Sequence, residues 1–317
     1  MKIVVLDGIV ANPGDLSWDK IKSLGDFVLY DRSDISQVEE RAKDADIVIV
    51  NKVVLNRETL SKLTNLKMIA LLSTGYNIID LDYTNEKGIV VCNVPAYSTP
   101  SVAQLTFAFI LELTMGVGLH SERVKNGEWS SCQDFCFWSQ SIIELKNKTI
   151  GIIGLGSIGL EVAKIANSFS MNVLGYSRNK KENLENIKQV ELDELLKNSD
   201  IISFHCPLNK ESQGMLNKDL IDKMKDGVFV INTARGSITN EKDVYNALVT
   251  KKMSGYAADV LCDEPPKTPS ILFKAPNCYI TPHIAWASID ARSRLLEAVY
   301  LNIKGFLENK IQNRVEK

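Results

Sequence analysis

The sequence predicts an α/β protein with two doubly wound parallel sheets. From the N-terminus, short apolar segments alternate with polar segments that are compatible with helices, and this order produces a parallel sheet. The alternation starts a second time at Thr149. The chain has 317 residues, more than one ordinary core requires, so two domains are expected.

The first series predicts one sheet with helices such as Ser33–Lys43 and Asn56–Leu63 between its strands. Pro95 and Pro100 end this series. The segment Ser101–Met115 then predicts a largely apolar helix, which is expected to be buried between domains or at a subunit interface. The expected strands are Ile3–Leu6, Ile47–Val50, Met68–Leu72 and Ile89–Cys92.

The second series is followed by an amphipathic helix, Ser288–Leu307, which lies outside the alternation and is expected to return to the first domain. We therefore expect one domain from residues 1–99 plus 287–317 and another from residues 100–286, with ligands in a cleft between them. The expected strands of the second domain are Thr149–Ile153, Asn172–Tyr176, Ile201–Phe204, Val228–Asn232, Ser254–Asp259 and Cys278–Thr281.

A glycine pattern follows the first strand of the second series and predicts a Rossmann-like dinucleotide site. Gly154 permits a tight turn, Gly156 allows the backbone to approach a pyrophosphate, and Gly159 allows close packing of helix and strand. The first helical turn, which includes Ser157 and Ile158, offers free N–H groups to the phosphates. The alternative is a glycine-rich turn without a ligand.

The residues after the next strand bear on which cofactor is used. An NAD site usually has Asp or Glu about 20 residues beyond the glycines, but this chain has Ser177 followed by Arg178. Ser177 can hydrogen-bond a 2′-phosphate and Arg178 can bind it through two parallel donors. The sequence therefore favours NADP over NAD. The alternative is that Arg178 is a solvated loop cation and that NAD is the cofactor.

Composition limits the partners. The formal net charge of −2 argues against nucleic acid binding, and no apolar stretch approaches the ~20 residues of a membrane span. The six cysteines are scattered, which favours reduced thiols and a cytoplasmic location. No metal site is expected, since Cys132 and Cys136 lack a second pair of ligands.

Three side chains that follow strands are the candidates for catalysis. Arg235 comes after the expected strand 228–232 and can bind a carboxylate with two N–H groups. His283 follows a strand and a proline, and histidine suits proton exchange near neutral pH. Glu264 lies in a proline-containing loop and can orient the histidine. In isolation, a surface Arg and a solvated loop carboxylate remain the alternatives.

Several motifs in order make the whole chain resemble the D-isomer-specific 2-hydroxyacid dehydrogenases. The resemblance implies a flavodoxin-like substrate domain built from both chain ends, and Arg235, Glu264 and His283 as catalytic residues. It also implies that Ser73, Thr74 and Gly75 bind the substrate carboxylate, that Thr233, Ala234, Asp259 and His283 contact the cofactor near the nicotinamide, and that Cys206 and Pro207 line the adenine pocket. The motifs are Ser73–Asn77, Ile79–Leu81, Asn93–Gln104, the glycine pattern, Thr233–Gly236, Asp259–Pro265 and Thr281–His283.

Two details resemble the glycerate dehydrogenase branch of this family. Gln104 stands where many members have Glu, and Phe137-Trp138 precedes the glycine pattern. This implies reduction of a small 2-keto acid, such as hydroxypyruvate or glyoxylate, by a homodimer. The alternatives are a dinucleotide-sensing binding protein, a formate or phosphite dehydrogenase, and phosphoglycerate dehydrogenase-type activity.

Overall fold

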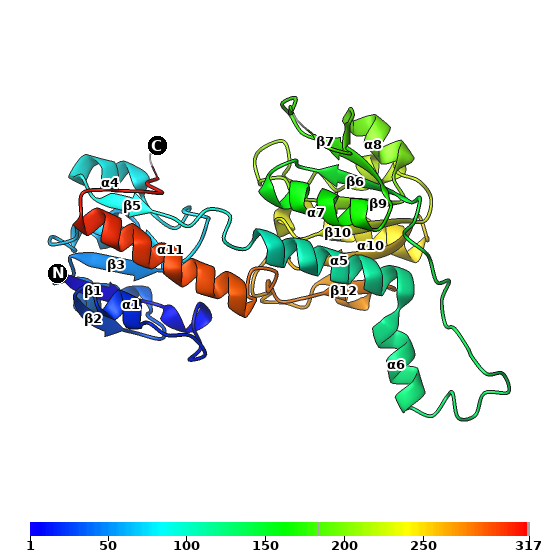
Figure 1. The fold of residues 1–317 in the computed structure, drawn as a ribbon, viewed down its shortest axis with the longest axis horizontal. Coiled ribbons are helices and arrows are strands. Elements are labelled where there is room, and N and C mark those ends of the chain that lie inside the picture. Colours follow the sequence, from blue (N-terminus) through cyan, green and yellow to red (C-terminus); the bar gives the residue numbers. More distant parts are fainter. Residues whose placement is uncertain (183, 316–317) are drawn as a thin grey trace. The chain divides into compact units, whose positions relative to one another are not determined.

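A computed structural model of the chain describes residues 1–182 and 184–315 and divides them into two compact units. The first unit comprises Met1–Ser98 and the C-terminal stretch from Trp286, and the second comprises Thr99–Ala285. These boundaries lie one residue from the expected crossings at 99/100 and 286/287. Each unit has its own sheet and its own apolar core (Figure 1).

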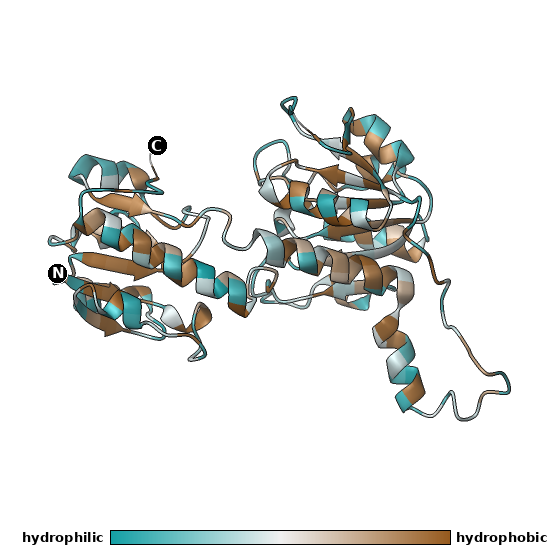
Figure 2. Cartoon of the chain, viewed as in Figure 1, coloured by the Kyte–Doolittle hydropathy of each residue, from teal (hydrophilic) through white to brown (hydrophobic). Residues whose placement is uncertain are grey.

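The first unit contains, in its described residues, a five-stranded sheet in the order β2-β1-β3-β4-β5. Every pairing is parallel, and this is the flavodoxin-like order that was expected. Figure 2 shows these strands as largely hydrophobic, because both faces of the sheet are covered. The strands are β1 (Lys2–Val5), β2 (Asp26–Leu29), β3 (Ile47–Val50), β4 (Met68–Leu71) and β5 (Val90–Cys92).

Alternate residues of these strands enter two different cores. Val4 and Val48 pack with side chains of α2, α3 and α4, whereas Ile3 and Ile47 pack with α1 and the C-terminal helix α11. The chain end is therefore part of the first unit's core. The helices are α1 (Asp19–Lys22), α2 (Val38–Ala42), α3 (Arg57–Ser61), α4 (Leu81–Lys87) and α11 (Ile289–Leu307), with 3-10 helices η1 (Gly8–Val10) and η2 (Ile35–Gln37).

A buried arginine ties α11 to the N-terminal part of the unit. The side chain of Arg292 is 9% exposed and binds both carboxylate oxygens of Asp15 at 2.7 and 2.6 Å. It also donates to the carbonyl of Ala287. Ser288 caps the helix by accepting a hydrogen bond from the N–H of Ala291. The expected helix over Ser288–Leu307 is confirmed.

The second unit contains, in its described residues, a seven-stranded parallel sheet in the order β12-β11-β10-β9-β6-β7-β8. Counted from β6, this is the Rossmann strand order extended by one strand. The strands are β6 (Thr149–Ile153), β7 (Asn172–Tyr176), β8 (Lys188–Gln189), β9 (Ile201–Phe204), β10 (Val228–Asn232), β11 (Met253–Ala258) and β12 (Cys278–Ile280).

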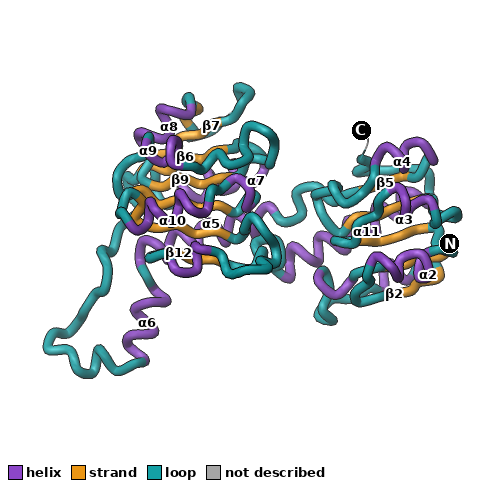
Figure 3. The backbone as a smooth tube through the Cα atoms, turned by 180° about the vertical axis from the view of Figure 1, so that it is seen from behind, coloured by secondary structure: helices purple, strands orange, loops and turns teal. Residues whose placement is uncertain are grey.

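The apolar helix α5 belongs to the core of the second unit, where Phe107, Ile110 and Leu113 pack with strand residues such as Ile150 and Ile231. After it, α6 and the following loop extend away from the rest of this unit (Figure 3). The helices are α5 (Thr99–Met115), α6 (Val117–Lys125), α7 (Ser157–Ser168), α8 (Leu192–Asn198), α9 (Lys218–Asp222) and α10 (Glu241–Val249), with 3-10 helices η3 (Gly236–Ile238) and η4 (Ile271–Lys274).

Within the described residues, no single helix has the length and apolar content needed to cross a membrane. Helices α5 and α6 taken together have the length and apolar composition of a membrane span, but the two are bent by 58° at Gly116. All six cysteines lie within the described residues, and each is a free thiol.

Candidate active site

The glycine turn between β6 and α7 has little room for side chains at two of its three glycines. Gly154 has a φ of +107°, and a Cβ there would lie 2.6 Å from the backbone of His205 and Cys206. A Cβ at Gly159 would lie 2.0 Å from the carbonyl oxygen of Gly154. At Gly156, by contrast, a Cβ would meet nothing within 4 Å. The turn therefore leaves an open approach to the backbone at Gly156.

This open approach coincides with the N-terminus of a twelve-residue helix, α7. Gly156 is the N-cap residue and offers no side-chain cap, so the N–H groups of Ser157, Ile158 and Gly159 can bind an anion there. The arrangement fits the pyrophosphate of a dinucleotide.

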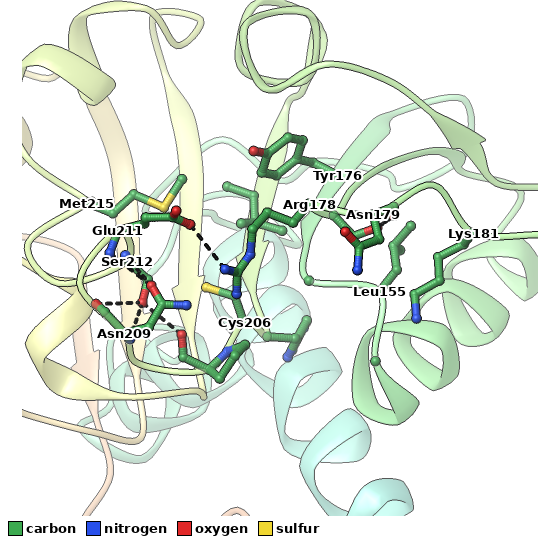
Figure 4. Close-up of a pocket in the computed structure, with 16 residues that line it drawn as sticks. Leu155, Tyr176, Arg178, Asn179, Lys181, Cys206, Asn209, Glu211, Ser212 and Met215 are labelled. Atoms are coloured by element: carbon green, nitrogen blue, oxygen red, sulfur yellow. Dashed lines mark hydrogen bonds and ion pairs between the residues drawn. The ribbon is translucent and has the colours of Figure 1, made fainter.

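A cavity of about 540 Å³ adjoins the turn (Figure 4), a size typical of small-molecule sites. Its walls come from the glycine turn, from the end of β7 and from the segment that follows β9. Cys206 and Pro207, for which the resemblance implies an adenine contact, are both among its lining residues. The other lining residues are Ile153, Gly154, Leu155, Gly156, Tyr176, Ser177, Arg178, Asn179, Lys181, His205, Asn209, Glu211, Ser212 and Met215.

At the end of β7, the predicted 2′-phosphate ligands already have partners within the protein. The Ser177 hydroxyl donates to the carbonyl of Asn179 at 2.8 Å and accepts from Gln189 Nε2 at 3.1 Å. The Arg178 guanidinium lies 3.6 Å from the Glu211 carboxylate (Figure 4). Sequence reasoning missed Gln189 and Glu211, because neither lies near the glycine pattern in the chain.

His205 also lines the cavity, and it is held as a neutral imidazole. Burial lowers the pKa of His205 to about 3. Its Nε2 lies 2.8 Å from the Ser203 hydroxyl, while its buried Nδ1 has no hydrogen-bond partner among the described residues. A neutral, half-buried histidine at this place is suited to packing rather than to proton transfer.

The turn after β10 is shaped by the buried Asn232. Its Oδ1 accepts the N–H of Ala234 at 3.0 Å, and its Nδ2 donates to the carbonyl of Arg235 at 2.9 Å. The Arg235 side chain is exposed and donates only to the carbonyl of Ala234 among the described residues. It is therefore free to bind an anion. Thr233 hydrogen-bonds Thr106 of α5 at 3.1 Å.

Glu264 and His283 form a pair in which Glu264 Oε2 lies 2.6 Å from His283 Nδ1. The other carboxylate oxygen of Glu264 accepts the N–H of Leu261 at 2.8 Å. This pairing fixes the ring orientation and leaves Nε2 as the atom that can exchange a proton. His283 has a φ of +55°, a conformation uncommon for residues other than glycine.

Asp259 holds the loop that carries His283. This carboxylate is 1% exposed and accepts three hydrogen bonds, from Thr281 Oγ1 (2.5 Å), the Ile284 N–H (2.8 Å) and the Ala285 N–H (2.7 Å). Burial raises the pKa of Asp259, against these hydrogen bonds, which lower it. The sequence predicted Asp259 as a contact of the cofactor. Its hydrogen bonds to the loop that carries His283 were not predicted.

These groups lie at one edge of the sheet, since β10, β11 and β12 are neighbours and parallel. Arg235 follows β10, Glu264 follows β11 and His283 follows β12. The first two loops touch closely, because a Cβ at Gly236 would lie 1.8 Å from the carbonyl oxygen of Leu261. The arrangement combines an anion-binding cation with an oriented proton donor.

In the first unit, the predicted carboxylate-binding loop follows β4. The Ser73 hydroxyl donates to the carbonyl of Gly75 at 2.6 Å, and the Thr74 hydroxyl donates to that of Val94 at 2.7 Å. Among the described residues, the N–H groups of Thr74 and Gly75 have no acceptor, so both can bind a ligand. Sequence reasoning missed Asn51 at the end of β3, whose buried Nδ2 has no partner within residues 1–182 and 184–315.

No group of three or more His, Cys, Asp or Glu side chains that could hold a metal ion occurs in residues 1–182 and 184–315.

Comparison with known proteins gives a consistent result. Residues 107–285 match the family model described as D-isomer specific 2-hydroxyacid dehydrogenase, NAD binding domain. The chain is 45% identical to a hydroxypyruvate reductase of Blautia hydrogenotrophica, over the full length of both proteins.

Solved structures agree. One is an acyclic imino acid reductase in complex with NADPH and D-Arg, with a TM-score of 0.86 and 32% identity, covering 99% of this chain and 100% of that one. Another is the D-lactate dehydrogenase of Aquifex aeolicus complexed with NAD and lactic acid, with a TM-score of 0.81 and 34% identity, covering 98% and 96%. The chain therefore belongs to the D-isomer-specific 2-hydroxyacid dehydrogenase family and is an NAD(P)-dependent oxidoreductase.

Proposed function

We propose that this enzyme reduces hydroxypyruvate or glyoxylate to the D-2-hydroxy acid, with NADPH as the preferred reductant. The observation that carries the proposal is the Glu264–His283 pair, 2.6 Å apart, at the same sheet edge as Arg235, which has no acidic partner among the described residues. The similarity to a hydroxypyruvate reductase supports the choice of substrate.

In the proposed mechanism, the N–H groups of Thr74 and Gly75 bind the substrate carboxylate, and Ser73 keeps their loop in shape. Arg235 binds the carboxylate and the keto oxygen and draws electron density from the carbonyl carbon. When bound, the reduced nicotinamide supplies the hydride to that carbon. His283 gives its Nε2 proton to the oxygen, and Glu264 stabilises the charged ring before transfer. In the reverse direction, His283 accepts the proton.

The cofactor is proposed to lie along the second unit, residues 100–286, which makes residues 1–99 plus 287–317 the substrate domain. The turn at Gly154, Gly156 and Gly159 and the N–H groups of α7 hold the pyrophosphate. Cys206 and Pro207 contact the adenine, while Thr233, Ala234 and Asp259 adjoin the nicotinamide. The absence of a carboxylate at Ser177, together with Arg178, supports the preference for NADP(H) over NAD(H).

The test is to follow oxidation of the reduced cofactor by absorbance, with hydroxypyruvate, glyoxylate, pyruvate and phenylpyruvate, each with NADPH and with NADH. We expect the highest kcat/KM with hydroxypyruvate or glyoxylate and NADPH. A preference for NADH would contradict the cofactor assignment alone. Cofactor binding without turnover of any keto acid would favour a dinucleotide-sensing role.

We further propose a homodimer in which the segment after α6 binds a second copy of the chain. The side chains of Trp129, Phe135 and Trp138 are 52%, 88% and 67% exposed in the isolated chain, and exposed apolar groups of this size mark interaction sites. Phe135→Asp combined with Trp138→Asp is expected to give a monomer in sedimentation experiments. The six free thiols support a cytoplasmic location.

A further inference from the structure

The cofactor cavity has one carboxylate among its described lining residues, Glu211. The backbone at Glu211 is fixed by a turn in which Asn209 Oδ1 accepts the N–H groups of Glu211 and Ser212 at 2.9 and 3.0 Å. The Ser212 hydroxyl in turn donates to the carbonyl of Pro207 at 2.7 Å. The backbone that carries this carboxylate is thus fixed on the wall that follows β9, and the Glu211 side chain extends toward Arg178 at the end of β7 (Figure 4).

Across the cavity, Arg178 points toward this carboxylate, with 3.6 Å between Nη1 and Oε2. The two side chains are 64% and 70% exposed. An ion pair so exposed contributes little free energy, so a ligand that carries more negative charge can replace Glu211 as the partner of Arg178.

The Ser177 hydroxyl is less available to a 2′-phosphate than the sequence predicts. A serine hydroxyl has one proton to donate, and that of Ser177 goes to the carbonyl of Asn179. The Ser177 hydroxyl also accepts a hydrogen bond from Gln189 Nε2. The cations among the described lining residues are Arg178 and Lys181, and Arg178 is the one that pairs with Glu211.

We propose that Glu211 tunes cofactor selection by competing with the 2′-phosphate of NADPH for the Arg178 guanidinium. The inference rests on the cofactor site proposed above. The 2′-phosphate of NADPH competes with the Glu211 carboxylate for the Arg178 guanidinium, whereas the 2′-hydroxyl of NADH carries no charge and leaves the Arg178–Glu211 pair intact. Glu211 thus weakens the binding of NADPH and has little effect on the binding of NADH. It therefore reduces the difference in affinity between the two cofactors.

The test uses Glu211→Gln and two fragments without nicotinamide, 2′-phosphoadenosine 5′-phosphate and adenosine 5′-phosphate, measured by titration calorimetry at low salt. Removal of an exposed ion pair is expected to tighten the 2′-phosphate fragment about twofold to fivefold, from the free energies typical of such pairs. The fragment without this phosphate should bind as before. Glu191→Gln, the same charge change at an exposed residue outside the cavity, should alter neither.

The same comparison in an Arg178→Gln background tests whether the effect of Glu211 requires Arg178. If Glu211 acts through Arg178, the added substitution Glu211→Gln should change binding of the 2′-phosphate fragment less than 1.5-fold there. An undiminished effect would refute competition for Arg178, as would equal effects on both fragments or no effect in the first experiment. Because the fragments cannot react, these results stand apart from whether hydroxypyruvate is reduced.

Discussion

Asp259 is the residue whose replacement tests most directly how the active-site loop is held. In Asp259→Asn the volume is kept, but one carboxylate oxygen becomes an NH2 group. Since the two oxygens accept hydrogen bonds from Thr281, Ile284 and Ala285, either orientation of the amide places a donor against a donor. The loop that positions His283 therefore loses at least one hydrogen bond to a charged acceptor.

Such a bond contributes about 1.5–3 kcal/mol. The loss is partly offset, because burial of the charged Asp259 is itself unfavourable, as its raised pKa indicates, and Asn is neutral. A net change of ~1–3 kcal/mol in the loop corresponds to a fall in kcat of about 5-fold to 160-fold, if His283 must occupy its present position to react. Thr281→Val removes one donor and leaves the carboxylate, so its effect should be smaller.

The assay is steady-state reduction of hydroxypyruvate, with kcat and KM determined separately and the Tm of each variant measured by calorimetry. We expect kcat to fall in the order wild type, Thr281→Val, Asp259→Asn, with the Tm lowered by about 2–4 °C for each kcal/mol lost and the fold retained at the assay temperature. A folded Asp259→Asn enzyme with kcat within twofold of wild type would refute the proposal that the hydrogen bonds of Asp259 position the loop that carries His283. An increase confined to the cofactor KM would assign Asp259 to the cofactor instead.

Three further predictions follow from geometry. Gly156→Ala should keep the Tm and raise the cofactor Kd about tenfold, because its Cβ meets no protein atom within 4 Å but occupies the approach to the helix N-terminus. Gly159→Ala should instead lower the Tm, since its Cβ would lie 2.0 Å from a carbonyl oxygen; equal Tm values for the two variants would contradict this reading. His283→Gln should lower kcat about 10²-fold to 10⁴-fold, and a near-normal rate in a folded variant would remove His283 as the proton donor. The Arg292 guanidinium lowers the pKa of Asp15 below its ordinary 3.8, so this carboxylate stabilises the fold fully above that value and progressively less as the pH falls through the folded-state pKa. Asp15→Asn should therefore reduce the free energy of unfolding in urea at neutral pH, by a difference that shrinks in acid; a difference independent of pH would count against the ion pair.

Much of the fold was predictable because interior parallel strands are continuous apolar segments. The expected bounds of β3, β6, β7, β9 and β10 agree with the structure. The edge strands β2 and β8 were missed. Each pairs with a single neighbour. β8 consists of the polar residues Lys188 and Gln189 and so has no apolar run, whereas β2 has the short apolar run Phe27–Leu29 but is only partly buried.

The candidate site divides in the same way. The positions of Gly154, Arg235 and His283 at the ends of β6, β10 and β12 were predictable, because each follows a recognisable apolar strand. Asp259 accepts the N–H of Ala285, which is 26 residues further along the chain. Arg178 pairs with Glu211, which is 33 residues further along. No local pattern encodes such contacts, because they depend on which loops meet at the carboxyl edge of the sheet.

The contribution of α11 to the first unit has a consequence for synthesis on the ribosome. Residues 1–98 emerge first, with one face of their sheet lacking the apolar side chains that α11 supplies, such as Leu295, Val299 and Ile303. The whole of Thr99–Ala285 must be translated before that helix is available, which takes roughly 10 to 40 s at typical elongation rates. During that interval α1 covers part of this apolar face of the nascent N-terminal sheet and the part that α11 covers stays exposed, while the second unit can complete its own core first.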